Sequence, residues 1–131
     1  MPYLLDTGTL AEALRSVPSR TLVRKLTGVP SRDRWTSVLT VSQLLVAARR
    51  NGHPKLMQYV VRLVPSIRVA PFDVAAAQAF AKLRATVAQE GDPDDAMIAA
   101  IAIANEWTLV TRRPRDFERF GNLRREDWVA G

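Results

Sequence analysis

Three aspartates lie beside apolar segments that are far apart in the chain. Asp6 follows one apolar run directly, Asp95 precedes another, and Asp116 lies shortly after a third. Each has an ordinary interpretation as well: Asp6 as a helix cap, Asp95 as an acid in a first helical turn, and Asp116 as a solvated loop acid paired with an arginine. Their shared position next to the core favours a common site.

Carboxylates gathered in one place repel each other, by roughly 4 kcal/mol for a pair at ~4 Å and an effective dielectric of ~20. A divalent cation removes that penalty, and oxygen ligands suit Mg²⁺ or Mn²⁺. The corresponding chemistry is metal-assisted hydrolysis of a phosphate ester. The one histidine, His53, lies in a Gly-His-Pro turn and is more typical of a surface residue than of a general base.

Composition supports a globular, basic, cytoplasmic protein. Nineteen Lys and Arg residues against 13 Asp and Glu give a net charge of +6, which favours polyanionic partners. Arginines crowd the C-terminal segment 112–125, whereas acids crowd the stretch 90–95. The absence of cysteine excludes disulfides and thiolate sites and suits a reducing compartment. No segment is apolar enough to suggest a membrane span, so we expect no membrane association.

The elements that must position these acids alternate between strand and helix. Strands are predicted at 3–5, 35–39, 67–70 and 108–111, and helices from just after Asp6 and at 18–27, 40–51, 54–64, 73–91 and 95–105, with a helical turn and an edge segment within 117–128. Thr9-Leu10-Ala11-Glu12 has the form of a capping box, and Asp73 and Asp94 are candidate caps. This pattern predicts one α/β domain over 1–131, with a parallel sheet covered on both faces and a site at the carboxyl ends of its strands.

Several segments, in order, resemble the PIN-domain toxins of the VapC type. Residues 3–10 (YLLDTGTL) resemble the opening strand and its Asp-Thr-Asn motif, and 36–45 (TSVLTVSQLL) the second strand and helix. The other matching segments are 69–73 (VAPFD), 95–100 (DAMIAA), 108–111 (TLVT), 115–120 (RDFERF) and 123–128 (LRREDW). Each match is weak alone, but their order and spacing together are specific.

The resemblance implies a three-layer α/β/α sandwich with a mostly parallel sheet of four to five strands. It also implies a homodimer, Mg²⁺-dependent cleavage of RNA, and neutralisation by a cognate VapB-like antitoxin. Position by position, the catalytic set becomes Asp6, Asp95, Asp116 and Gln43, with Asp6 and Asp95 as metal ligands. Thr7, Thr111, Arg112 and Arg113 take substrate-binding positions.

The chain departs from the family pattern at several of these positions. Gln43 stands where the family has a glutamate, which keeps the shape but loses the charge and predicts metal binding weaker by about 10- to 100-fold. Gly8 stands where asparagine is usual, and Arg112-Arg113 where short polar or acidic residues are common. The loop before Asp95, Gly91-Asp92-Pro93-Asp94, is shorter than usual, so Asp94 could share or replace the role of Asp95.

These departures leave more than one function open. The first hypothesis is an active endoribonuclease toxin. The second is a module that dimerises and binds antitoxin or RNA without cleaving it, because Gln43 weakens the site. A third is a cytoplasmic α/β domain without a nucleic-acid role. The sequence does not reveal the target RNA.

Overall fold

A computed structural model of the chain describes residues 1–52, 54–86 and 91–130. His53 and residues 87–90, which include Glu90 and fall within the predicted fifth helix, lie outside the described residues. The strands are β1 (Tyr3–Leu5), β2 (Arg34–Ser37), β3 (Arg68–Ala70), β4 (Thr108–Val110) and β5 (Arg125–Glu126). The helices are α1 (Thr7–Ala13), α2 (Arg20–Thr27), α3 (Val38–Arg50), α4 (Pro54–Ser66), α5 (Val74–Thr86) and α6 (Pro93–Asn105), with 3₁₀ segments η1 (Ser31–Asp33) and η2 (Pro114–Phe120).

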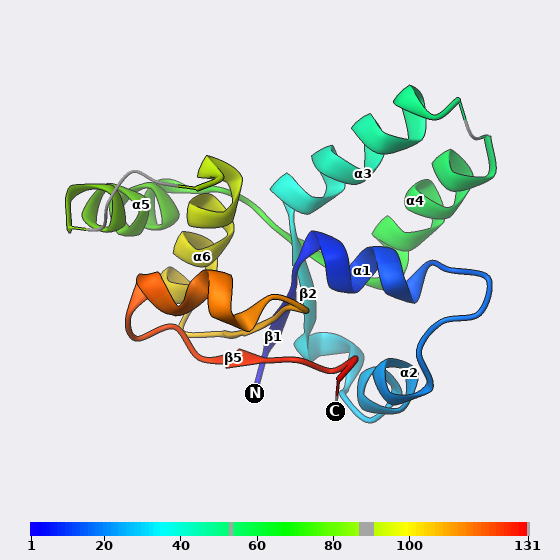
Figure 1. Cartoon of the computed structure of the whole chain (residues 1–131), viewed down its shortest axis with the longest axis horizontal. Helices are drawn as coiled ribbons and strands as arrows, with labels where there is room; N and C mark the ends of the chain where they lie inside the picture. The colour runs from blue at the N-terminus through cyan, green and yellow to red at the C-terminus, as the bar shows by residue number, and fades with distance from the viewer. Residues whose placement is uncertain (53, 87–90, 131) are drawn as a thin grey trace.

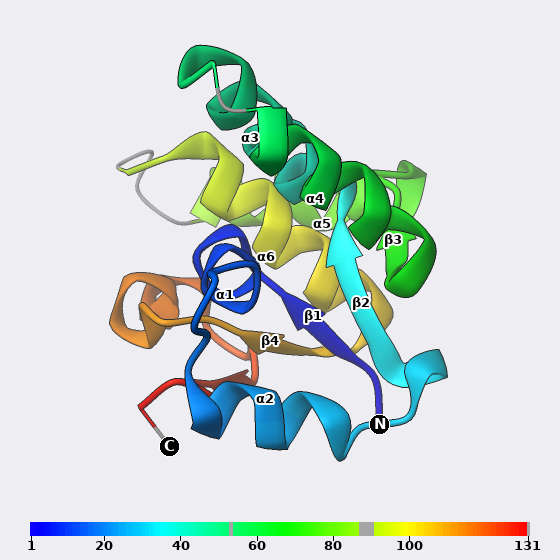
Figure 2. The same cartoon turned by 90° about the vertical axis from the view of Figure 1, so that its right-hand side faces the viewer.

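The five strands form one sheet in the order β3-β2-β1-β4-β5, and every described pairing in it is parallel. Figure 2 shows β2, β1 and β4 side by side, with α1 leaving the end of β1. The all-parallel sheet matches the predicted architecture and places the carboxyl ends of the strands together. Since β1 is central, the residue that follows it lies in the middle of that end.

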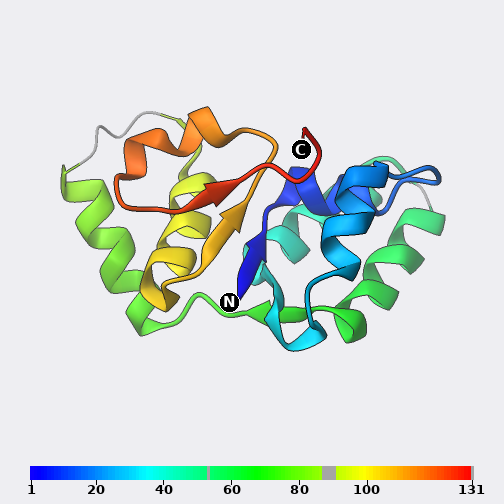
Figure 3. The same ribbon diagram turned by 90° about the horizontal axis from the view of Figure 1, so that it is seen from below.

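Helices cover both faces of the sheet, which gives three layers. Figures 1 and 3 show α5, α6 and η2 on one side, and α2 and α4 on the other. Adjacent residues of β1 face the two layers: Leu4 packs in the cluster with α6 and η2, and Leu5 in the cluster with α1, α2, α3 and α4. Leu109 and Val110 of β4 alternate in the same way. The sheet is therefore buried on both faces, as parallel sheets are.

Helix caps account for most of the differences from the predicted boundaries. Asp6, not Thr9, caps α1, because its Oδ1 accepts the Thr9 N–H at 2.9 Å. Asp92, not Asp94, caps α6, and its Oδ1 accepts the Asp94 N–H at 2.9 Å. The predicted capping box at Thr9 was thus wrong, whereas the start of the helix directly after Asp6 and the alternative interpretation of Asp6 as its cap are confirmed. Asp73 accepts the Ala76 N–H at the start of α5, as predicted.

The second predicted strand is also shorter than expected. Ser37 ends β2 and caps α3, its hydroxyl accepting the Thr40 N–H at 3.0 Å. Val38 and Leu39, assigned to the strand from their apolar character, belong to the first turn of α3. Among the described residues, no helix is long and apolar enough to cross a membrane.

A substitution at Leu109 tests how much the core around the sheet contributes to the free energy of unfolding. This side chain is fully buried, so Leu109→Ala should lower the free energy of unfolding by about 2–5 kcal/mol through lost burial and the cavity left behind. Val17→Ala, at a side chain that is 79% exposed, is the control and should change it by no more than about 0.5 kcal/mol. Urea unfolding followed by circular dichroism measures both; equal effects would contradict this assignment of the core.

Candidate functional site at the carboxyl ends of the strands

Asp6 lies at the centre of the carboxyl end of the sheet, directly after β1. Its backbone N–H donates to the carbonyl of Val110 at 3.0 Å, which ties it to the end of β4. The side chain is only 2% exposed, and the α1 cap engages one of its two carboxylate oxygens. The sheet and the helix start thus fix a buried negative charge at this point.

Asp95 lies in the first turn of α6 and is also buried. Both of its oxygens accept hydrogen bonds from Arg113: Oδ1 from Nη2 at 3.1 Å, and Oδ2 from Nη1 at 3.2 Å. This bidentate geometry is the strong form of the arginine–carboxylate pair. Arg113 therefore supplies the positive charge that compensates the buried Asp95 in this structure.

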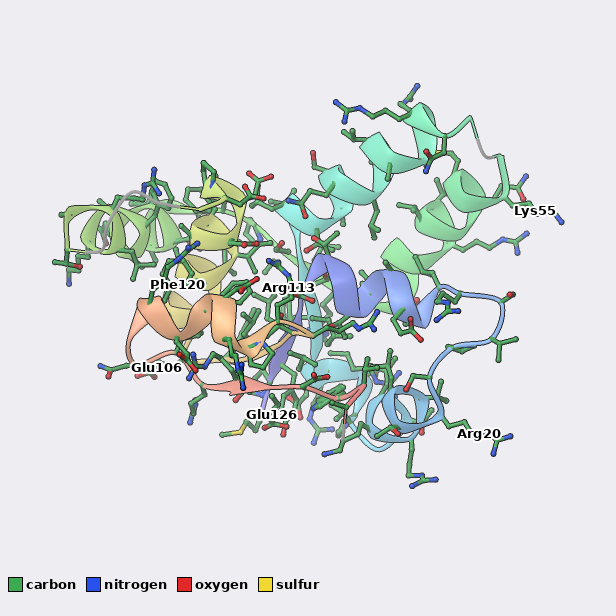
Figure 4. The ribbon with its side chains drawn as sticks, viewed as in Figure 1. Arg20, Lys55, Glu106, Arg113, Phe120 and Glu126 are labelled. Atoms are coloured by element: carbon green, nitrogen blue, oxygen red, sulfur yellow. The ribbon has the colours of Figure 1, made fainter. Side chains whose placement is uncertain are left out.

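Asp116, in η2, contacts the same guanidinium from the solvent side. Its Oδ2 accepts from Arg113 Nη1 at 3.0 Å, and its side chain is 55% exposed. Figure 4 places Arg113 near the middle of the molecule, between α6, η2 and the start of α1. The hydrogen bonds and charge of Asp95, with Asp116 and then Asp6, raise the pKa of Arg113 against the opposing effect of its partial burial. All three predicted aspartates thus act on one cation.

Gln43 is held in a defined orientation between Thr7 and Asp94. The Thr7 hydroxyl donates to Gln43 Oε1, and Gln43 Nε2 donates to Asp94 Oδ2 at 2.8 Å. A glutamate at position 43 could not donate to Asp94 and would place a second negative charge beside it. Asp94 therefore places a carboxylate next to the neutral Gln43 side chain, and its sharing of the role of Asp95 stays a prediction.

Thr111 and Arg112 have structural partners. Thr111 is fully buried, and its Oγ1 accepts the Arg113 N–H at 3.0 Å, which fixes the turn after β4. Arg112 lies 3.5 Å from the carboxylate of Glu12 and keeps a side chain that is 48% exposed. Thr111 is therefore closed off from solvent, whereas the Arg112 side chain is accessible.

Glu12 is the residue that sequence reasoning missed. It is buried in α1, and its carboxylate accepts from Arg15 at 3.1 Å and from the Ser19 N–H at 3.1 Å, in addition to its contact with Arg112. The Arg15 hydrogen bond is the main cause of its lowered pKa, ahead of the desolvation that opposes it. Its position three residues after the buried Thr9, on the same face of α1, was the available signal.

The described residues contain no cluster of three or more metal-ligating acids or histidines. The donor set nevertheless fits a hard divalent ion in kind, because Asp6 and Asp95 are buried carboxylates on neighbouring elements and offer only oxygen. What occupies the Asp95 oxygens is Arg113. Asp6 and Asp95 are thus the pair that would hold such an ion, once Arg113 has moved.

Two of the hollows formed by the described residues differ in their relation to the acids. A groove of about 460 Å³ runs along α3 from Gln43 and Asp94 to Arg50 and Asn51. A larger hollow, of about 880 Å³, lies around the C-terminal end of α6 and η2 and is not lined by any of the predicted site residues. The smaller groove is the one that reaches the site.

The chain has relatives among known proteins. The family model described as the PIN domain matches residues 3–123. The chain belongs to the PIN-domain family. A tRNA(fMet)-specific endonuclease VapC of Shigella flexneri is 31% identical, with 98% of each chain covered. Toxin FitB of Neisseria gonorrhoeae is 33% identical, covering 87% of this chain and 89% of that protein.

Solved structures give the same answer for the fold. The crystal structure of DNA-bound VapBC from Salmonella typhimurium contains a chain 27% identical to this one, with a TM-score of 0.86 and 98% of both chains covered. The three-layer PIN fold and the VapC-type resemblance predicted from sequence are confirmed. The roles of the individual site residues stay predictions.

Glu12 should make a pH-dependent contribution to stability. Its pKa is lowered below the ordinary 4.5 in the folded chain, so its stabilising effect is present above that value and is lost as pH falls through the folded-state pKa. Glu12→Gln should therefore be less stable than the wild type at pH 7, with the difference shrinking below pH 4.5. Urea midpoints across this range measure it, with the exposed Glu118→Gln as control. A constant difference at all pH values would contradict the assignment.

Proposed function

We propose that this PIN-domain protein is a metal-dependent endoribonuclease that acts as the toxin of a VapBC-type pair. The observation that carries this proposal is the pair of buried carboxylates, Asp6 and Asp95, at the carboxyl end of the sheet. Two buried acids, one held by the α1 cap and the other by a partly exposed arginine, are costly to fold and indicate a functional site. Relatives with the same fold along their whole length are named as endonucleases and ribonucleases.

In this proposal Asp6 and Asp95 hold Mg²⁺ or Mn²⁺. When bound, such an ion lowers the pKa of a coordinated water and offsets the charge that develops on the phosphate. Asp6 is held rigid by the α1 cap and the end of β4, which keeps its carboxylate in one place during the reaction. Thr7 and Asp94 orient the Gln43 amide, whose carbonyl oxygen can accept a hydrogen bond from a water in the site.

The RNA backbone would contact the arginines that flank the acids. Glu12 holds Arg15 and Arg112 side by side, and both keep about half or more of their side chains exposed. Phosphates of a single strand can therefore contact two guanidinium groups whose positions are set by one buried carboxylate. Arg113 lies next to them and becomes available to a phosphate when it leaves the aspartates.

The proposal also includes a VapB-like antitoxin and a homodimer. The antitoxin is supported by the solved relatives, which include VapBC from Salmonella typhimurium and FitAcB from Neisseria gonorrhoeae, and the homodimer by the family resemblance alone. The net charge of +6 suits an acidic or RNA-like partner at the same surface. The binding-only alternative is less well supported, because Asp94 retains a carboxylate beside Gln43 and because relatives across this family are named as nucleases.

The nuclease proposal predicts metal-dependent cleavage by the wild-type chain. Labelled structured RNA should be cut in Mg²⁺ or Mn²⁺ and left intact in EDTA. Asp6→Asn and Asp95→Asn should each lower the rate at least about 100-fold, since direct ligands matter at least as much as the groups that support them. Glu118→Gln is the matched control, because it removes the same charge from an exposed position of η2. Cleavage that persists in both site variants would refute the assigned pair.

Gln43→Glu separates the nuclease from the binding-only alternative. The new carboxylate would lie beside Asp94, with a repulsion of about 1–4 kcal/mol at ~4 Å before relaxation, so the variant should be less stable in EDTA. Added Mg²⁺ should restore the stability of the variant. The wild type should itself cleave RNA at a measurable rate in the same assay as the variant. Thermal melts with and without Mg²⁺, together with the same cleavage measurement, test this. RNA cleavage by the variant alone would show that Gln43 silences the site.

A further inference from the structure

Arg113 occupies the position that a bound cation would need. Its two terminal nitrogens each donate to one oxygen of Asp95, at 3.1 and 3.2 Å, and Nη1 also donates to Asp116 at 3.0 Å. Asp6 adds a third negative charge within electrostatic range of the same group. One guanidinium therefore offsets one of the three negative charges that act on it at the carboxyl end of the sheet.

We propose that Arg113 is the resident cation of this site, that Arg113 and a divalent ion occupy the Asp95 carboxylate alternately, and that Asp116 is the anchor that holds Arg113 there. The inference deepens the proposed nuclease function and rests on it, because it concerns how the same site is loaded. It changes the role of Asp116 from a member of the catalytic set to a positioning residue that acts through Arg113.

The two cations exclude each other for geometric and electrostatic reasons. Mg²⁺ binds carboxylate oxygen at 2.0–2.1 Å, in an octahedral shell that keeps several waters. That shell needs the space and the lone pairs that the two Arg113 nitrogens now take. A guanidinium left in place would also bring a positive charge close to the ion.

The two members of the pair differ in their freedom to move. The Asp95 side chain is 9% exposed and starts from a capped helix, whereas the Arg113 side chain is 49% exposed and starts from the turn after β4. The Arg113 side chain can therefore move into solvent, whereas the buried Asp95 side chain cannot. Exchange therefore proceeds by departure of the arginine.

Asp116 is placed to oppose that departure. Its carboxylate is half-exposed and shares Nη1 with Asp95, so it holds the guanidinium from the side through which it would leave. The Asp116 N–H also donates to the Arg113 carbonyl at 3.0 Å, so the two residues belong to one turn. An anchor of this kind lowers metal affinity, whereas a metal ligand raises it, and this difference in sign is measurable.

Asp116→Asn is the sharper test, because it changes an exposed side chain and leaves the Asp95–Arg113 pair able to form. If Asp116 anchors Arg113, the variant should bind Mn²⁺ about 10-fold more tightly than the wild type, at the lower end of what changes around a metal site produce. If Asp116 is a metal ligand, the variant should bind Mn²⁺ more weakly. Isothermal titration and the electron paramagnetic resonance signal of free Mn²⁺ measure this, with Glu118→Gln as the control for loss of one negative charge in η2.

Arg113→Gln and Arg113→Lys test the resident cation itself. The glutamine variant should bind Mn²⁺ about 10- to 100-fold more tightly and should gain more in melting temperature from Mn²⁺ than the wild type. The lysine variant keeps the charge but not the bidentate contact, so its Mn²⁺ affinity should lie between those of the wild type and the glutamine variant. Arg115→Gln, at an exposed neighbour, should match the wild type apart from the general effect of one lost positive charge. If the glutamine variant does not fold without metal, folding on addition of Mn²⁺ supports the proposal.

The outcomes separate this inference from the proposed function. Mn²⁺ affinity that is unchanged or lower in both Asp116→Asn and Arg113→Gln overturns it, even if the wild type cleaves RNA. Absence of Mn²⁺ uptake by every variant overturns it as well. Tighter Mn²⁺ binding without any RNA cleavage supports the resident cation and contradicts the nuclease function.

Discussion

The compensation of buried negative charge at the carboxyl end of the sheet is the constraint around which this PIN domain is arranged. Asp6 and Asp95 are taken out of water by β1, β4 and α6, and a buried carboxylate requires a cation or a set of hydrogen bonds. The chain provides both: the α1 cap for Asp6, and a bidentate arginine for Asp95. The Thr111 hydroxyl closes the turn after β4 by accepting the Arg113 N–H, and this turn holds Arg113 beside Asp95.

The same principle organises the flank of the site. Glu12 is another buried acid at this end of the molecule, and it gathers Arg15 and Arg112 from two elements that are about a hundred residues apart in sequence. The buried Glu12 thus fixes Arg15 and Arg112 on the surface of the molecule. This arrangement explains how a chain with a net charge of +6 presents basic groups in defined positions next to a site built of carboxylates.

Gln43 shows how one substitution changes the requirements of its neighbours. An amide at this position links Thr7 to Asp94, with its oxygen facing one and its nitrogen the other. The Asp94 carboxylate lies on the first turn of α6, where a helix N-terminus stabilises its negative charge. The neutral Gln43 side chain thus has a carboxylate as its neighbour.

The sequence by itself determined the layers, the parallel sheet and the meeting of Asp6, Asp95 and Asp116, because strand ends and apolar periodicity are local properties. It offered both Asp6 and a Thr9 capping box for α1 and chose the wrong acid for α6, since several polar residues near a helix start look alike until the backbone selects one. Only the tertiary structure decided that Arg113 lies on Asp95 and that Glu12 is buried with Arg112. The partner of a charged side chain depends on which distant elements the fold brings together, and no local pattern encodes that.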